Sequence, residues 1–476
     1  MKQLNRETPF NLPVKVIQFG EGNFLRAFVD WQIDLLNEGS GLNAGVVIVR
    51  PISRPDFPLL DEQGGVYTTL IRGLNENGEP VRDFRKIACV KQEIDIQASF
   101  KDYLALARLP DIRFIISNTT EAGITTSDAD RYDDTPPATF PAKLTLLLHE
   151  RFVTFNGDRN KGLVLLPCEL IDYNGEALKA AISYYVKLWK LEGGFQAWLD
   201  DACTFCSTLV DRIVTGYPRD EMAEITKELA YEDKFLVTAE YFYLFVIQGP
   251  KWLADELKLE GSGLNIQLVD DITPYKQRKV GVLNGGHTTM VPVALLCGLE
   301  AVRPSVEDAD VGKFLLEAID QEIIPALPLP RSELEPFAED VLRRFRNPYI
   351  YHRLDSIALN SWSKYAARVL PQVLRYRELN GSLPRRLVTA LAATMFLYRG
   401  DIIALQDDKT YLDWFADSWK AYASGTLSLH DMVKQWLGNT ALWKQDLTLV
   451  PGLVEETAQT LRDIENEGMR QVIRKI

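Results

Sequence analysis

The chain has 476 residues, of which 46% are hydrophobic and 25% are charged, and its formal net charge at pH 7 is −13. This length exceeds one ordinary hydrophobic core, so the sequence predicts two domains. The acidic excess argues against nucleic acid as a partner, because phosphate binding needs a basic face. An anionic small molecule would need a local cluster of Lys or Arg.

The sequence shows no secretion or membrane signal. Residues 1–6 are polar and are not followed by an apolar segment of the signal-peptide type, and no run of about 18 apolar residues occurs. We therefore expect a cytoplasmic protein with no membrane partner. Cys203 and Cys206 form a Cys-x-x-Cys pair, but no second Cys or His pair stands at ligand spacing. Two buried thiols are favoured over a zinc or redox site, and we expect no metal.

The first predicted unit is a strand, a glycine turn, a helix and a second strand. Residues 14–19 are a short apolar run, 20–23 read Gly-Glu-Gly-Asn, 24–36 have a helical pattern, and 45–50 form another apolar run. This order predicts a βαβ unit of the Rossmann type, whose glycine turn binds a dinucleotide pyrophosphate at the helix N-terminus. Leu25 replaces the third glycine of the usual fingerprint, so a plain strand-to-helix turn is the alternative.

Two further strand-like runs, 113–117 and 162–167, end in the polar segments 118–123 and 168–170. In an open α/β sheet, ligands bind beyond the carboxyl ends of the strands. Both segments are therefore candidate walls of a ligand cleft. Ordinary strand-to-loop connections would have the same composition.

Residues 279–287, Lys-Val-Gly-Val-Leu-Asn-Gly-Gly-His, bring a base, an amide and an imidazole within nine positions: Lys279, Asn284 and His287. A lysine can exchange a proton with an alcohol oxygen, and an amide can donate to the oxygen of a reacting carbonyl. An imidazole can bind the same oxygen or a neighbouring hydroxyl. The stretch predicts chemistry at a carbonyl. The alternative is a two-glycine turn with a solvated lysine and a packed histidine.

After about residue 271, amphipathic helical patterns replace the strand-like runs. We therefore expect an α/β Rossmann-type dinucleotide-binding domain over residues 1–271 and a mostly α-helical substrate and catalytic domain over 272–476. The predicted helices lie near 311–326, 334–345, 350–378, 384–399 and 453–470, with connectors at 325–330 and 400–410.

Residues 20–28 resemble the pattern Gly-x-Gly-x-Phe-x-Arg-Ala of the polyol-specific long-chain dehydrogenases, the mannitol dehydrogenase family. Val-Asp-Arg-Ile at 210–213 is similar to the Val-Asp-Arg signature of that family. The Lys, Asn and His of 279–287 match its Lys-x4-Asn-x2-His pattern. Arg-Asn-Pro at 346–348 and Lys364 match a second cluster. The resemblance covers essentially the whole chain in the same order.

The resemblance implies a metal-independent hydride transfer with NAD, here between a keto-uronate and an aldonate. In this interpretation Lys279 is the acid for ketone reduction and the base for alcohol oxidation, Asn284 holds the carbonyl oxygen, and His287 binds the substrate nearby. The implied cofactor-binding residues are Val16, Ile17, Gln18, Phe19, Gly20, Glu21, Gly22, Asn23, Phe24, Leu25, Arg26 and Ala27. The open alternatives are a different keto-uronate, a mannitol-type polyol, or a nucleotide-binding regulatory protein without catalysis.

Three positions raise questions about the site. Leu170, with Asn174 nearby, stands where the family has a second oxyanion amide, and Ser356 stands where relatives have an Arg that contacts polyols. The residue that binds the carboxylate of a sugar acid is therefore unidentified. Arg50 ends the second strand in place of the Asp or Glu that usually binds the adenosine ribose. We expect Arg50 to serve the adenine or the diphosphate of NAD, not a 2′-phosphate.

Overall fold

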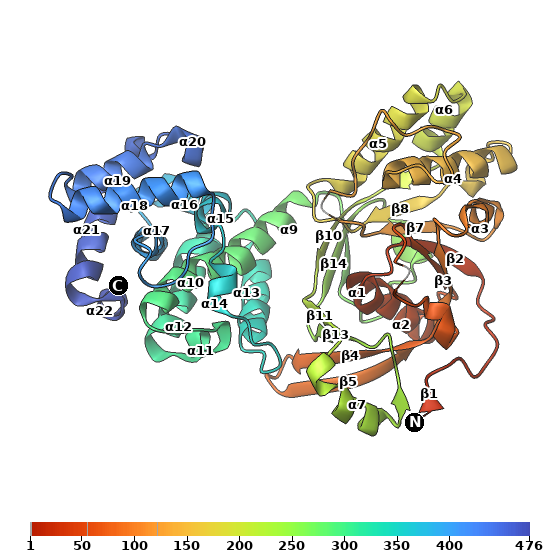
Figure 1. Ribbon diagram of the computed structural model, residues 1–476, viewed down its shortest axis with the longest axis horizontal. Helices are drawn as coiled ribbons and strands as arrows, with labels where there is room; N and C mark the ends of the chain where they lie inside the picture. Colours follow the sequence, from red (N-terminus) through yellow and green to blue (C-terminus); the bar gives the residue numbers. More distant parts are fainter. Residues whose placement is uncertain (1, 55, 121) are drawn as a thin grey trace. The chain divides into compact units, whose positions relative to one another are not determined.

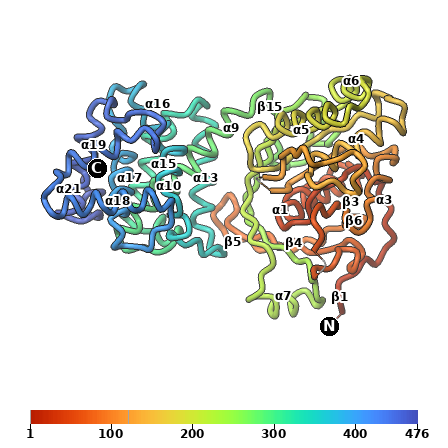
Figure 2. The backbone as a smooth tube through the Cα atoms, turned by 45° about the horizontal axis from the view of Figure 1, so that its top comes forward, coloured from red at the N-terminus to blue at the C-terminus, as the bar shows by residue number. Residues whose placement is uncertain are grey.

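The structure is a computed structural model that describes residues 2–54, 56–120 and 122–476. It divides into two compact units, which Figures 1 and 2 show in sequence colours. The first unit comprises Met1–Gly73 and Val81–Ile272, and the second comprises Leu74–Pro80 and Thr273–Ile476. Within the described residues, no helix is both long enough and apolar enough to span a membrane.

The first unit is organised around a six-stranded parallel sheet. Its strands, in spatial order, are β6 (Val90–Asp95), β3 (Gly45–Arg50), β2 (Val14–Phe19), β7 (Phe114–Ser117), β8 (Val164–Pro167) and β9 (Thr204–Phe205). The chain order reverses beside β2, which is where ligands bind in doubly wound sheets. The predicted Rossmann-type fold and the predicted strands 14–19 and 45–50 are confirmed.

Helices cover both faces of this sheet (Figure 1) because successive side chains of a strand point to opposite faces. Val16 packs on the face covered by the continuous helical segment α1 (Asn23–Leu25), η1 (Arg26–Asp30) and α2 (Trp31–Gly39). Ile17 and Phe19 pack on the other face. The helices on that face are α3 (Phe100–Ala105), α4 (Phe140–Thr154), α5 (Asn174–Leu188) and α6 (Gly193–Asp201).

Smaller sheets, which the sequence patterns did not predict, pack against the helical segment 23–39. One contains β11 (Val214–Gly216), β13 (Val237–Glu240), β4 (Tyr67–Leu74) and β5 (Pro80–Ile87); another contains β10 (Ser207–Asp211), β14 (Leu244–Gln248) and β15 (Ile266–Val269). Phe28 meets Phe245 of β14 edge to face, with ring centroids 5.3 Å apart. The remaining elements are β1 (Lys2–Gln3), α7 (Met222–Leu229), β12 (Tyr231–Glu232), α8 (Leu253–Glu256) and the 3-10 helices η2 (Leu60–Gln63), η3 (Leu106–Arg108), η4 (Arg159–Lys161) and η5 (Arg219–Glu221).

The second unit is built from helices, as predicted. Its helical elements are α9 (Thr273–Arg278), η6 (Lys279–Asn284), α10 (Gly285–Leu296), α11 (Val302–Glu307), α12 (Ala309–Ala318), η7 (Ile319–Ile323), η8 (Ile324–Ala326), α13 (Arg331–Phe345), α14 (Leu354–Ile357), α15 (Ser361–Arg368), α16 (Leu370–Asn380), α17 (Arg385–Leu397), α18 (Lys409–Ala423), α19 (Leu429–Leu437), α20 (Thr440–Trp443), η9 (Leu447–Leu449), α21 (Leu453–Glu467) and α22 (Met469–Arg474). Figure 2 shows α17 inside this bundle, where it packs against α10 and α21.

The prediction of one helix over 350–378 is wrong, because three helices, α14, α15 and α16, cover this stretch. Asn360 has the left-handed φ of +52° immediately before α15. Pro371 lies in the first turn of α16, where its missing N–H and fixed φ start a helix but cannot continue the previous one. The break places the end of α15 against the start of α10, as described below.

Candidate active site

The segment that contains the three predicted catalytic residues is helical throughout. Elements α9, η6 and α10 follow one another without a break from Thr273 to Leu296, and Gly285 and Gly286 form the first turn of α10. The alternative of a two-glycine turn is therefore wrong. Glycine has a low intrinsic helix propensity. The segment is helical nevertheless, because α10 is almost entirely buried and its packing against other helices stabilises the helix more than the glycines destabilise it.

The π-helical turn η6 brings Lys279 and Asn284 to one side of this segment. In a regular α-helix, residues five positions apart point about 140° away from each other. A turn of the i→i+5 type places them above one another instead, and such turns are frequent at functional sites. His287 follows Asn284 by three positions of regular α-helix, which keeps it on the same side. The local geometry thus groups the three side chains.

Glycines allow other helices to approach this segment closely. A Cβ on Gly281 would lie 2.8 Å from the side-chain nitrogen of Gln372, in α16. A Cβ on Gly285 would lie 3.2 Å from the backbone oxygen of Arg368, the last residue of α15. Both contacts are tighter than a side chain accepts without displacement. Glycine at these positions therefore allows the last residue of α15 and the first turn of α16 to pack against the segment that carries the predicted catalytic residues.

Lys279 and Asn284 are both half-buried. The backbone oxygen of Asn284 accepts a hydrogen bond from the Thr288 hydroxyl at 2.9 Å. Its side-chain amide has no hydrogen-bond partner in the described part of the chain, so it is available to donate to a ligand oxygen. Lys279 has interactions of its own within the structure.

His287 lies in an aromatic cage. Its ring stacks on Phe345 of α13, with centroids 4.0 Å apart, and meets the edge of His352 at 5.4 Å. The buried Nε2 atom has no hydrogen-bond partner among the described residues. A buried polar atom without a partner is costly in a stable protein, so it indicates a ligand-binding role.

The surroundings of His287 are positively charged. Burial lowers its pKa well below the usual range, and four neighbouring groups lower it further: His352, Arg344, Arg368 and Lys364. Three of these are Arg or Lys side chains from α13 and α15. In a chain with a net charge of −13, this is the local cationic cluster that an anionic substrate requires. Only Lys364 was singled out from the sequence, because the cations are scattered along the chain without a motif.

In the first unit, the glycine turn has the geometry of a phosphate site. Gly20 has φ +117°, and a Cβ there would lie 3.0 Å from the backbone oxygen of Asn118, so only glycine fits. A Cβ on Gly22 would meet nothing within 4 Å. The helix that begins at Asn23 has no side-chain cap within the described residues, which leaves N–H groups facing this space.

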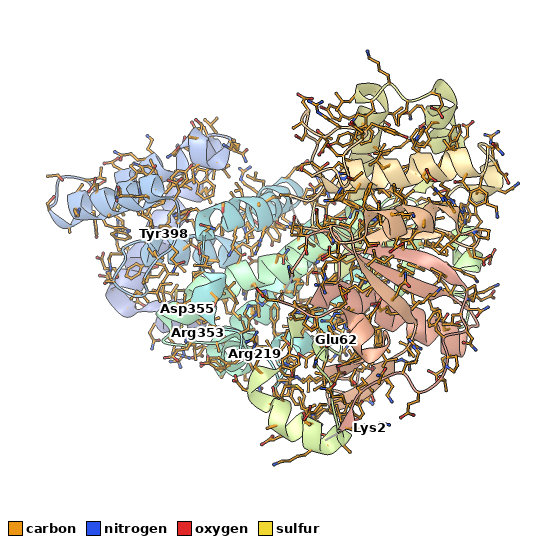
Figure 3. The ribbon with its side chains drawn as sticks, turned by 45° about the vertical axis from the view of Figure 1, so that its right-hand side comes forward. Lys2, Glu62, Arg219, Arg353, Asp355 and Tyr398 are labelled. Atoms are coloured by element: carbon orange, nitrogen blue, oxygen red, sulfur yellow. The ribbon has the colours of Figure 1, made fainter. Side chains whose placement is uncertain are left out.

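A cavity adjoins this turn and is lined by basic side chains. Arg54, Arg219 and Lys234 reach it from three different segments, and Arg219 is the first residue of the 3-10 helix η5 (Arg219–Glu221); Arg219 is labelled in Figure 3. The full lining is Glu21, Gly22, Asn23, Arg26, Arg54, Phe57, Tyr217, Arg219, Lys234 and Leu236. A diphosphate fits this combination of free N–H groups and cations. These three cations could not be grouped from the sequence, because they are far apart in the chain and share no motif.

The predicted cofactor-binding residues do not all reach the cavity. Glu21, Gly22, Asn23 and Arg26 line it. Residues 16–19 of β2, Leu25 and Ala27 are buried in the core, so they fix the shape of the turn. Arg26 donates hydrogen bonds to the backbone oxygens of Glu21 and Phe235 and to the Asn23 side chain. It therefore braces the glycine turn. Cofactor contact by these residues stays a prediction.

The expected role of Arg50 is wrong. Its side chain is 1% exposed and donates hydrogen bonds to Glu93 at 2.7 Å and to the backbone oxygens of Arg54, Phe57 and Pro58. Four of its five N–H groups are thus used within the fold, and Arg50 does not line the cavity beside the glycine turn, so it is not placed to bind adenine, diphosphate or a 2′-phosphate. Arg50 instead fixes the loop that follows β3, which carries Arg54 to the cavity.

The two polar segments after β7 and β8 are joined by a buried carboxylate, Glu169. It accepts hydrogen bonds from the Ser117 hydroxyl and from the backbone and hydroxyl of Thr119. Residue 121 of the predicted segment 118–123 lies outside the described residues. Asn174 is fully buried, and its amide donates to the backbone oxygens of Glu169 and Thr208. It is therefore a brace between segments and not a second oxyanion donor.

The cysteines behave as predicted, since Cys203 and Cys206 are both buried free thiols. Burial raises the pKa of each to about 12, so neither is a nucleophile at neutral pH.

Family models of known proteins match each of the two structural units separately. The family models "Mannitol dehydrogenase Rossmann domain" and "Mannitol dehydrogenase C-terminal domain" match residues 14–261 and 271–465. The chain is 55% identical to the altronate oxidoreductase of Yersinia enterocolitica, over 97% of this chain and 96% of that protein. It is 53% identical to the altronate oxidoreductase of Escherichia coli O6:K15:H31, with 100% of both chains covered.

Two solved structures share the fold. A D-sorbitol dehydrogenase in substrate-free form superposes with a TM-score of 0.81, at 19% identity, over 99% of this chain and 100% of that chain. The mannitol 2-dehydrogenase of Pseudomonas fluorescens, in a ternary complex with NAD and D-mannitol, superposes with a TM-score of 0.67 at 19% identity, over 99% and 96%.

Proposed function

The chain belongs to the mannitol dehydrogenase family, and from this premise we propose that it is an NAD-dependent altronate oxidoreductase, which interconverts D-tagaturonate and D-altronate. The observation that supports this most strongly is the 53–55% identity to altronate oxidoreductases over nearly the full length of both chains. The cationic surroundings of His287 fit a substrate with a carboxylate. The proposed setting is the cytoplasm, in the catabolism of hexuronates, with a sugar acid as substrate and no nucleic-acid or membrane partner.

The proposed reduction needs a proton at the ketone oxygen and a hydride at the ketone carbon. Lys279 gives the proton to the oxygen, and Asn284 donates a hydrogen bond to the same oxygen as its negative charge develops. Neutral His287 uses Nε2 to bind the oxygen or an adjacent hydroxyl. The product is an alcohol, and Lys279 takes the proton back in the reverse direction. When bound, the nicotinamide supplies the hydride.

NAD fits the glycine turn and its cavity on the observations above: the free space at Gly22, the uncapped helix N-terminus, and the cations Arg54, Arg219 and Lys234. These residues would hold the diphosphate. Glu21 lies in the same turn and pairs with Arg54 at 3.7 Å, which places a negative charge where an additional phosphate would be disfavoured. This arrangement supports NAD over NADP.

The test is steady-state oxidation of NADH by the purified chain with D-tagaturonate, D-fructuronate and D-fructose, and with NADPH in place of NADH. We expect the highest kcat/KM for D-tagaturonate with NADH. A higher kcat/KM for fructuronate or fructose would replace the proposed substrate. Binding of NADH without turnover of any substrate would support a regulatory protein instead.

A further inference from the structure

The side chain of Arg368 is a half-buried cation without a counter-charge. It is the last residue of α15, and neither a hydrogen bond nor an ion pair joins its guanidinium to any residue that the structure describes. Burial lowers its pKa from the usual value. Removing a cation from water without pairing it is unfavourable, so such a group is expected where an external anion binds.

Arg368 also lies directly beside the predicted catalytic residues. Its backbone oxygen is the atom that a Cβ on Gly285 would meet at 3.2 Å, and Gly285 separates Asn284 from the turn that bears His287. The charge of Arg368 acts on both His287 and Lys364. An anion held by Arg368 would therefore lie within reach of a substrate bound at Asn284 and His287.

The other two cations near His287 have partners. The Lys364 amine donates to the backbone oxygen of Ile357 at 2.8 Å and is influenced by the carboxylate of Asp407. Arg344 is 8% exposed, and its charge acts on Asp340. Of these three side chains, Arg368 has the donors that no described residue occupies.

We propose that Arg368 is the specificity-determining residue that binds the carboxylate of the sugar-acid substrate. A guanidinium can hold a carboxylate through two parallel N–H···O bonds, which fixes the orientation of the substrate as well as its charge. This assignment rests on the proposed function, because a neutral ketose has a hydroxymethyl group in place of the carboxylate. Arg368 would thus separate sugar acids from polyols while Lys279 and Asn284 act on either.

The experiment compares wild type, Arg368→Ala and Arg368→Lys on D-tagaturonate and on D-tagatose, which has a hydroxymethyl group where tagaturonate has the carboxylate. We expect Arg368→Ala to lower kcat/KM for tagaturonate about 10- to 100-fold, the range for a charge-assisted bond. Its kcat/KM for tagatose should not fall. Arg368→Lys should retain part of the tagaturonate activity, and guanidinium ion added to Arg368→Ala should restore part of it.

The matched control is Arg375→Ala, which removes an exposed cation of α16 that pairs with Glu378 at 2.7 Å; both kcat/KM values should stay at the wild-type level. Thermal unfolding of each variant separates folding defects from binding defects. If Arg368→Ala does not fold, the comparison of tagaturonate with tagatose is made with Arg368→Lys. Equal losses on tagaturonate and tagatose would overturn the role of Arg368. A wild type that does not turn over tagaturonate would instead overturn the proposed function.

Discussion

The imidazole of His287 stacks on the ring of Phe345, with 4.0 Å between the centroids and 25° between the planes. Burial of the ring, together with the nearby charges of Arg344, Arg368 and Lys364, lowers the pKa of His287 and keeps the imidazole neutral. A neutral imidazole has one donor and one acceptor nitrogen, so it can bind a hydroxyl or a carbonyl oxygen without adding a charge.

The low pKa of His287 predicts a specific pH dependence. Its nuclear magnetic resonance signals should not titrate between about pH 6 and 8, although a free histidine titrates near 6.5. Below about pH 6.5 the unfolded chain binds a proton that the folded chain does not, so this group lowers the free energy of unfolding as pH falls. His430→Gln, at an exposed position, is the matched control for assignment. A signal of His287 that titrates near pH 6.5 would contradict the conclusion that burial and nearby charges lower its pKa.

Lys279→Ala tests the proton-transfer role. We expect turnover to fall about 10²- to 10⁴-fold, the range for loss of general acid–base catalysis. NADH binding, measured by fluorescence titration, should be unchanged, and small primary amines should restore part of the rate. Lys276→Ala, one turn earlier in α9, controls for the loss of a cation. Near-normal turnover in Lys279→Ala would remove this residue from the mechanism.

Chelation tests the metal-independent mechanism. Among the described residues, no group of three or more His, Cys, Asp and Glu side chains is placed to hold a metal ion, and a catalytic zinc needs three protein ligands. Activity after prolonged dialysis against a chelator should therefore equal that of an undialysed sample. Loss of activity that zinc or manganese restores would count against this mechanism.

The nucleotide-binding half of the first unit could be predicted because its information is local. Apolar runs such as 14–19 and 45–50 are buried on both faces of a parallel sheet, so they read as continuous hydrophobic segments. The strands of the smaller sheets have mixed patterns. For example, β5 has exposed and half-buried residues along most of its length, so its pairing depends on distant strands.

The arrangement of the candidate site could be predicted only in part. The motif of Lys279, Asn284 and His287 was visible, but the π turn that groups them depends on packing around Gly281 and Gly285. Arg368 had no signal, because it becomes relevant only when α15 ends against α10. Arg50 was misinterpreted for the same reason: its partner Glu93 lies on the neighbouring strand β6.

Asp30 predicts a second pH dependence, which concerns stability. It is fully buried, and burial raises its pKa to about 7 despite a hydrogen bond from the Tyr67 hydroxyl at 2.8 Å. Asp30 Oδ1 and Gln18 Oε1 are buried acceptors without a donor among the described residues. A proton on Asp30 would satisfy both atoms, so the protonated acid is the favoured form.

The folded chain therefore retains this proton between about pH 4 and 7, where an unfolded Asp has lost it. The contribution of Asp30 to stability is greatest below pH 4, falls as pH rises to about 7, and is constant above that. Asp30→Asn should remove this decrease, which is on the order of 4 kcal/mol for about three pKa units. Urea unfolding at pH 4 and pH 8 measures it, with Asp34→Asn, at a partly exposed ion pair, as control. The same slope in wild type and Asp30→Asn would refute the assignment.

The last prediction concerns Arg50. Its buried hydrogen bonds stabilise the fold but do not reach the cavity beside the glycine turn, so replacing it should change stability without changing cofactor preference. Arg50→Ala would leave the Glu93 carboxylate buried without its cation, so the free energy of unfolding should fall by about 3–5 kcal/mol. The ratio of kcat/KM for NADH to that for NADPH should not change, because no Arg50 donor faces the cavity. Arg54→Ala is the matched control: its side chain is 65% exposed and pairs with Glu21 at the glycine turn. It should raise KM for NADH and leave stability nearly unchanged. A shifted cofactor ratio in Arg50→Ala, with an unchanged ratio in Arg54→Ala, would show that Arg50 contacts the nucleotide.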